Sequence, residues 1–133
     1  MAEQISQSEL ASASDTFYAA LADALDGDAT AMVDQWSQAD DVCYLGPMGD
    51  LIVGGDAVQE SWEQFAATHL GGKVTESELH FVGSGDIGIV TGWEKGVGHR
   101  GLDEPINIRA TSTYRREGGV LKMIGHHTDL IVM

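Results

Sequence analysis

Residues 106–129, INIRATSTYRREGGVLKMIGHHTD, are the stretch of sequence that decides the fold. β-Branched and aromatic residues lie on both sides of Glu117-Gly118-Gly119, where glycine supplies the positive φ angles of a tight turn. The pattern predicts two long antiparallel strands, 106–116 and 120–131, joined at these glycines. The second strand ends in two histidines and an aspartate, which are the first candidates for a functional site.

Helices and further strands are expected ahead of this hairpin. Apolar residues recur at three- and four-residue steps in a helix that begins at about Ser8 and ends at Gly27, in a short helix after Asp28, and in a third that begins near Asp56 and stops at Gly71-Gly72. Apolar and β-branched runs predict strands at 42–45, 51–53, 74–82 and 87–96. Helices followed by a long antiparallel meander indicate an α+β fold, in which helices cover one face of a curved sheet.

No cofactor or metal is expected. The segment GSGDIG at 83–88 satisfies the G-x-G-x-x-G pattern of dinucleotide-binding proteins, in which a helix N-terminus follows the glycines and binds the pyrophosphate. Here the next residues, IVTGW at 89–93, have the pattern of another strand, so the segment is predicted to be a hairpin turn. The five histidines have no metalloprotease spacing and the sequence has no cysteine pair.

The chain length and the cysteine count bound the class of protein. The 133 residues match one ordinary domain, so 1–133 is expected to fold as a single unit. Cys43 is the one cysteine, which excludes an internal disulfide framework and favours a reducing compartment. No export signal is expected at the first ten residues, and no apolar stretch is long enough to span a bilayer. A cytoplasmic location is predicted.

The charge of the chain is strongly acidic. Seven basic residues against 21 acidic ones give a formal net charge of −14. Such a charge repels nucleic acids and anionic lipid surfaces, so neither a nucleic acid nor a membrane is expected as a partner. A salty habitat and simple solubility both remain explanations for this acidity.

Strand alternation predicts the lining of a pocket, because successive side chains point to opposite faces. In 106–116 the apolar set, with Ile108, Ser112 and Tyr114, is expected to face inward. Ser112 and Tyr114 can then bind a carbonyl or hydroxyl group, although Tyr114 also suits a core position with its hydroxyl at the edge. The expected lining is mostly apolar with few polar groups, as in most small-molecule sites.

The last strand carries the candidate catalytic residues. Lys122 indicates that its own set of side chains, which includes His126, faces away from the pocket. Met123, His127 and Asp129 are then expected to face inward, where the carboxylate can orient the imidazole as a general acid or base. The other interpretation is a hydrogen-bonded histidine at the pocket rim, with Asp129 in solvent.

The outward side chains of the hairpin suggest a second kind of surface. Arg109, Thr111 and Thr113 lie on the outer face with Ile124 nearby, which favours self-association over ligand binding. Trp93 fits either the pocket mouth or that interface.

Four local motifs carry a family resemblance. They are Gly27-Asp28 ahead of Trp36, the Gly46-Pro47 turn, Gly54-x-x-x-Val58-x-x-x-Trp62, and Ala110-Thr-x-x-Tyr-Arg-Arg-Glu-Gly-Gly running on to His126-His127. With the order of elements, they resemble the nuclear transport factor 2-like superfamily over nearly the whole chain. The last motif is similar to the SnoaL-like branch and to relatives of the calmodulin-dependent kinase II association domain. The resemblance implies a cone-shaped, cystatin-like α+β barrel, with three helices on a strongly curved, mostly antiparallel sheet.

The same resemblance implies a pocket between helices and sheet, and a homodimer through the convex sheet face. Ketosteroid isomerase, in this superfamily, has a base aspartate and a protonated acid at positions that here fall beside Leu45-Gly46 and near Ala110. Neither position carries a carboxyl group. Trp36 and Trp62 fall where that enzyme has pocket tyrosines. They are expected to line the pocket, but they have no phenolic hydroxyl group that could donate a hydrogen bond to a ligand.

Two functions are consistent with these features. The first is a small-molecule-binding protein of the SnoaL-like type, acting as a cofactor-free isomerase, dehydratase or cyclase on an apolar or carbonyl-bearing ligand through His127 and Asp129. The second is a non-catalytic dimeric ligand-binding or assembly module. The expected ligand-binding wall consists of aromatic, hydroxyl and thioether side chains, namely Phe17, Trp36, Tyr44, Trp62, Phe65, Ser112, Tyr114 and Met123.

Overall fold

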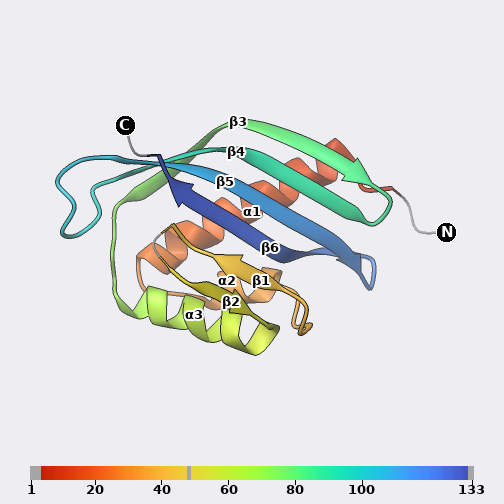
Figure 1. Cartoon of the computed structure of the whole chain (residues 1–133), viewed down its shortest axis with the longest axis horizontal. Coiled ribbons are helices and arrows are strands. Elements are labelled where there is room, and N and C mark those ends of the chain that lie inside the picture. Colours follow the sequence, from red (N-terminus) through yellow and green to blue (C-terminus); the bar gives the residue numbers. More distant parts are fainter. Residues whose placement is uncertain (1–3, 48, 132–133) are drawn as a thin grey trace.

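The computed structural model of the chain describes residues 4–47 and 49–131 (Figure 1). Within them the helices are α1 (Gln7–Leu25), α2 (Thr30–Gln35) and α3 (Gly55–Ala67). The strands are β1 (Cys43–Leu45), β2 (Leu51–Val53), β3 (Lys73–Ser84), β4 (Ile87–Val97), β5 (Ile106–Glu117) and β6 (Val120–Leu130). The α+β class and the order of elements expected from the sequence are confirmed.

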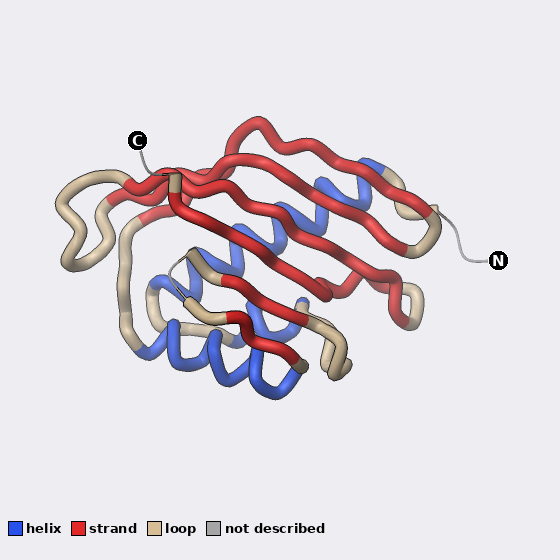
Figure 2. Tube along the Cα trace, in the orientation of Figure 1, coloured by secondary structure: helices blue, strands red, loops and turns tan. Residues whose placement is uncertain are grey.

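The strands form one mixed sheet with the order β2-β1-β6-β5-β4-β3. Neighbouring strands are antiparallel except β1 and β6, which run parallel. Strands β2 and β3 are the two edges of this sheet, so the sheet is open rather than closed into the barrel that the resemblance implied. Figure 2 shows the helices together on one side of the sheet, with α1 crossing behind the long strands and α3 beside β1 and β2.

Helix α1 covers the long strands because its sequence gives it a defined start and one apolar face. The Ser6 side chain accepts from the backbone N–H of Glu9, whose own side chain accepts from the Ser6 backbone, which forms a capping box. Leu10, Phe17 and Leu21 then follow at helical spacing and are buried. The helix packs against β3 and β4 and forms one wall of the space described below.

Both predicted hairpin turns are present. Gly118 and Gly119 have φ angles of 57° and 86°, which glycine adopts without strain, and they join β5 to β6. The G-x-G-x-x-G segment is the turn between β3 and β4, with no helix after it. A Cβ atom on Gly83 would lie 2.1 Å from the carbonyl oxygen of Ile5, so this glycine allows the segment before α1 to pack against the end of β3.

One irregularity in the last hairpin changes which side chains face inward. Thr113 pairs with Gly125, but the next residue of β5, Tyr114, pairs with Met123. Ile124 is therefore an extra residue in β6, a β-bulge, and the alternation of side chains reverses across it. Lys122 does lie outside, as expected, but the prediction that this places His126 on the same face is wrong.

The bulge divides β6 into two parts with opposite alternation. Met123 faces the core before it, and His126 and Thr128 face the core after it. His127 is exposed, so it lies on the outer face, and Asp129 shares its alternation.

None of the helices in the described chain is both long and apolar enough to cross a membrane.

Candidate active site

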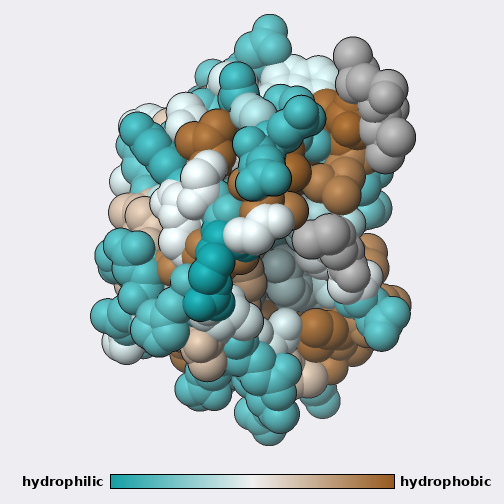
Figure 3. Space-filling view, turned by 90° about the vertical axis from the view of Figure 1, so that its left-hand side faces the viewer, coloured by the Kyte–Doolittle hydropathy of each residue, from teal (hydrophilic) through white to brown (hydrophobic). Residues whose placement is uncertain are grey.

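A cavity of about 270 Å³ lies between the inner face of the sheet and the helices α1 and α3. Its lining is mostly apolar, with side chains from both helices, from β1 and β3–β6, and from the loops at one end of the molecule. The polar exceptions are Tyr44, Glu94, His99, Arg100, His126 and Thr128. Figure 3 looks onto this end of the molecule, where hydrophobic residues gather beside a hollow flanked by hydrophilic ones.

Half of the expected ligand-binding wall lines this cavity. Phe17, Tyr44, Trp62 and Phe65 are on its surface. The other four expected residues are buried but do not line it; they are Trp36, Ser112, Tyr114 and Met123. The structure places these four side chains in the core around the cavity. A role in ligand contact therefore stays a prediction only for the residues that line the cavity, namely Phe17, Tyr44, Trp62 and Phe65.

Three of the four side chains that do not line the cavity have specific contacts. The Trp36 ring packs edge-on against Tyr44 with a centroid distance of 6.0 Å. The Tyr114 hydroxyl donates to the Ala13 carbonyl at 3.4 Å, so the core interpretation of this tyrosine fits the structure. Ser112 does not line the cavity itself, but it is hydrogen-bonded to His126, which does.

Four aromatic rings, one of them the imidazole of His126, form a closed series on one side of the cavity. The His126 ring lies 4.6 Å from Phe17 and 6.0 Å from Tyr44, measured between centroids. Tyr44 stacks on Trp62 at 4.9 Å, and Trp62 meets Phe17 at 6.4 Å. Each ring is thus held by two others, so the imidazole has a fixed orientation.

His126 is a buried imidazole with one nitrogen in use. Nδ1 lies 2.8 Å from the Ser112 hydroxyl, and no described residue hydrogen-bonds Nε2. Burial, and then the proximity of His127, lower the pKa of His126 to about 3, so the ring is neutral near pH 7. If Nδ1 carries the proton and Ser112 accepts it, Nε2 is a base; in the other tautomer Nε2 is a proton donor.

Glu94 is the buried carboxyl group of the cavity, and only 5% of its surface is exposed. Its Oε2 accepts from the Tyr18 hydroxyl at 2.7 Å. Burial raises the pKa of Glu94, and Glu76 adds to this, while the hydrogen bond from Tyr18 opposes it. Burial, followed by the charge of Glu94, also raises the pKa of Tyr44, so that hydroxyl keeps its proton.

Glu94 and His126 lie at different levels of the cavity. Glu94 pairs across the sheet with Ile108, whereas His126 pairs with Ser112, four residues further along β5. At about 3.3 Å per residue, this separates the two backbone positions by about 13 Å along the strands. The two groups are therefore suited to contact different atoms of one ligand rather than a single atom.

Two polar residues of the loop between β4 and β5, His99 and Arg100, line the mouth of the cavity. His99 Nδ1 lies 2.7 Å from the carbonyl oxygen of Gly71, and since a carbonyl can only accept, this nitrogen carries the hydrogen. The backbone N–H of Arg100 donates to Leu70 at 2.9 Å, and its Nη2 donates to the carbonyl of Thr68. The loop is thus fastened to the segment that follows α3.

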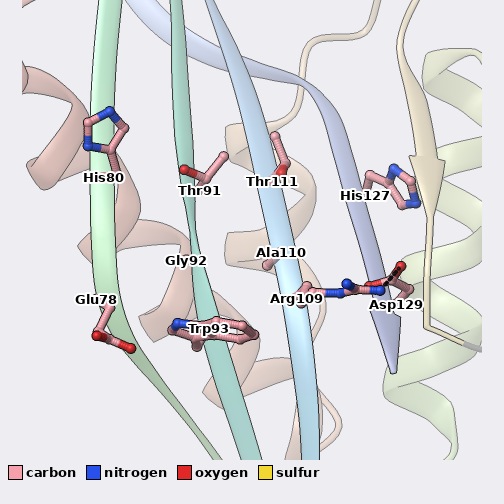
Figure 4. A pocket seen from close by; sticks show the side chains of 10 residues that line it. All are labelled: Glu78, His80, Thr91, Gly92, Trp93, Arg109, Ala110, Thr111, His127 and Asp129. Carbon is pink, nitrogen blue, oxygen red and sulfur yellow. Dashed lines mark hydrogen bonds and ion pairs between the residues drawn. The ribbon is translucent and has the colours of Figure 1, made fainter. Parts of the chain in front are cut away.

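The structure overturns the expected orientation of His127 and Asp129. Both line an open groove of about 430 Å³ on the outer face, together with Glu78, His80 and Trp93 (Figure 4). Asp129 does not orient an imidazole there, because both its oxygens accept from Arg109, at 3.0 Å each. Arg109 also lowers the pKa of Asp129.

Among the described residues, no group of three or more histidine, cysteine, aspartate or glutamate side chains could hold a metal ion.

A family model of the SnoaL-like domain matches residues 11–133. The chain belongs to the SnoaL-like domain family. This confirms the resemblance to the nuclear transport factor 2-like superfamily that the motifs carry. No protein with a curated description matches the chain.

Solved structures share the fold of this SnoaL-like domain. A proposed calcium/calmodulin-dependent protein kinase type II association domain from Thiobacillus denitrificans has a TM-score of 0.76 at 26% identity, with 92% of this chain and 94% of the other covered. A proposed dehydratase of the nuclear transport factor 2-like family from Streptomyces avermitilis has a TM-score of 0.79 at 22% identity, with 95% and 96% covered. A proposed ketosteroid isomerase from Parabacteroides distasonis has a TM-score of 0.67 at 19% identity, with 85% and 83% covered.

The buried state of His126 predicts its titration. Because the folded environment lowers the pKa of this imidazole to about 3, its ring-proton chemical shifts should stay constant from pH 8 to pH 5. Proton NMR of the wild type, with the His126 signals assigned by their loss in His126→Gln, measures this directly. A midpoint near pH 6.5 for those signals would show that the ring is open to solvent.

Proposed function

We propose that this SnoaL-like domain binds a small, largely apolar molecule with a carbonyl or hydroxyl group and moves a proton on it without a cofactor. The observation that carries this proposal is an apolar cavity with two titratable groups whose pKa values are shifted by burial: His126 is kept neutral and Glu94 is favoured in its protonated form. Opposite shifts of this kind are typical of acid–base sites.

The cavity limits the size of the molecule. A dry protein cavity of about 150 Å³ holds one benzene ring. The volume of about 270 Å³ between α1, α3 and the sheet is less than twice that value, so it fits a molecule of about two fused rings. A four-ring steroid or polyketide is too large for the cavity in this form.

Three polar groups of the cavity have roles in the proposed chemistry. His126 Nε2, in the tautomer that leaves it unprotonated, removes a proton from the carbon next to the ligand carbonyl. Glu94 delivers a proton to another atom of the same conjugated system, either to a carbon in an isomerisation or to a hydroxyl group that leaves as water in a dehydration. The Tyr44 hydroxyl, which keeps its proton, is placed to donate to the ligand oxygen. The apolar walls exclude competing water.

The similarities support this reaction class only in general terms. A structure proposed to be a dehydratase and another proposed to be a ketosteroid isomerase share the fold at 22% and 19% identity. The position at which the resemblance places the base aspartate of ketosteroid isomerase carries Leu45-Gly46 here, so the proposed acid–base groups are this chain's own. If a ligand binds in the cavity but the protein transfers no proton, the domain is a non-catalytic ligand-binding module.

Proton transfer can be tested with 2-tetralone, a two-ring ketone with acidic protons next to its carbonyl. The wild type in deuterated water should accelerate deuterium incorporation at that carbon, and His126→Gln should lower the rate by about 10²-fold or more, the usual contribution of a general base. Proton NMR of 2-tetralone measures the exchange. His127→Gln, which changes the adjacent histidine on the outer face, is the matched control and should leave the rate unchanged.

Two results would contradict the assignment. Loss of exchange in His127→Gln with retention in His126→Gln would place the chemistry on the outer face. Binding of 2-tetralone without any acceleration of exchange would favour the passive binding module.

We also propose that the chain forms a homodimer through the outer face of the sheet. Large apolar side chains are exposed there, with Val82, Ile89 and Trp93 at 46%, 38% and 41% exposure. The same face carries both Arg109 and Glu78, so a two-fold arrangement can place opposite charges against one another. This assigns Trp93 to the interface rather than to the pocket mouth.

Light scattering at low micromolar concentration tests the dimer. The wild type should have about twice the monomer mass of 14.2 kDa, and Trp93→Glu should move it towards the monomer because a charge would be buried at the interface. Ser8→Glu adds the same charge on α1, away from this face, and should keep the dimer mass. A wild-type species of 14.2 kDa would refute the proposal.

A further inference from the structure

Arg100 differs from the other arginines of the chain in its contacts. Arg109 pairs with Asp129, Arg115 with Asp41 and Glu117, and Arg116 with Glu9. Within residues 4–47 and 49–131, no carboxylate lies within ion-pair distance of Arg100. In a protein with a net charge of −14, a guanidinium without a carboxylate is unusual, and this one is at the mouth of the cavity.

The structure holds Arg100 in a fixed position. Its backbone N–H and one guanidinium nitrogen donate to two carbonyl groups of the segment that follows α3, those of Leu70 and Thr68. The adjacent His99 fastens the same loop to Gly71. A Cβ atom on Gly72 would lie 2.5 Å from the carbonyl oxygen of Val97, so glycine allows the two segments to meet this closely. A guanidinium held in advance loses less freedom when a ligand binds.

The remaining donors of Arg100 have no partner charge in the cavity lining. A guanidinium has five N–H donors, and the contact with Thr68 uses one nitrogen. Glu94 is the one carboxyl group of the lining, and burial raises its pKa and so favours its neutral form. The apolar side chains of Leu70 and Leu102 line the same mouth. The arrangement offers one positive charge next to an apolar interior.

We infer that Arg100 binds a carboxylate of the ligand, so the substrates of this cavity are small apolar monocarboxylic acids of about two-ring size. The guanidinium fork matches the two oxygens of a carboxylate, and a single cation in so acidic a protein suits a single negative charge. The apolar body of the ligand then extends inward, towards His126 and its aromatic neighbours. This inference rests on the proposed function, because it uses the same cavity.

Isothermal titration calorimetry with 2-naphthoate and with 2-naphthamide, its uncharged isostere, tests the inference. The wild type should bind 2-naphthoate at least tenfold more tightly than 2-naphthamide. Arg100→Gln should weaken 2-naphthoate binding by at least tenfold and leave 2-naphthamide binding within twofold. Lys95→Gln removes the same charge from an exposed position on β4, and should leave both affinities unchanged.

A cavity-filling variant separates this inference from the proposed function. Ile108→Trp should abolish binding of both molecules, and Leu21→Trp serves the same purpose if that variant does not fold, since both residues line the cavity. Equal affinity of the wild type for the two molecules, with no effect of Arg100→Gln and loss in the filled variant, would overturn the carboxylate inference and leave the cavity as a binding site. Binding of neither molecule, or binding that the filled variants retain, would overturn both proposals.

Discussion

The extra residue in β6 is the constraint on which the rest of the site depends. Ile124 interrupts the pairing of β5 with β6, so Met123 faces the core on one side of it and His126 on the other. Without the bulge, regular alternation would place His127 inside and His126 in solvent. A single inserted residue therefore selects which of two adjacent histidines belongs to the cavity and which belongs to the outer groove.

Burial gives the selected groups their chemistry. The rings of Phe17 and Tyr44 pack against His126, with Trp62 stacked on Tyr44, and burial among them keeps the imidazole neutral, while Ser112 fixes its orientation through Nδ1. The same apolar interior favours the protonated form of Glu94. The cost of burying these polar groups is offset by one hydrogen bond to each. This packing leaves Nε2 of His126 without a hydrogen-bond partner among the described residues, and it places the Glu94 carboxyl group at a different level of the same cavity.

The sequence predicted those features that depend on local patterns. The first helix, the Gly118-Gly119 turn and the inward set of β5 follow from spacing over a few residues, and the structure confirms them. The inward position of His126 could not be predicted from alternation, because a bulge depends on pairing with another strand. Gly125 was the available signal, since an isolated glycine within a strand pattern often marks a bulge. Glu94 had a signal too, because it shares the alternation of buried Val90.

The mouth of the cavity had no signal of this kind. Arg100 lies in a loop whose position depends on contacts with a segment about 30 residues earlier, and no local spacing specifies such contacts. The central claim, that His126 rather than His127 faces the interior, is tested most directly by nuclear Overhauser contacts between imidazole and aromatic ring protons. With ring centroids 4.6 Å apart, His126 should show strong contacts with Phe17, and His127 should show none. Contacts from His127 to Phe17, with none from His126, would contradict the bulge and the site built on it.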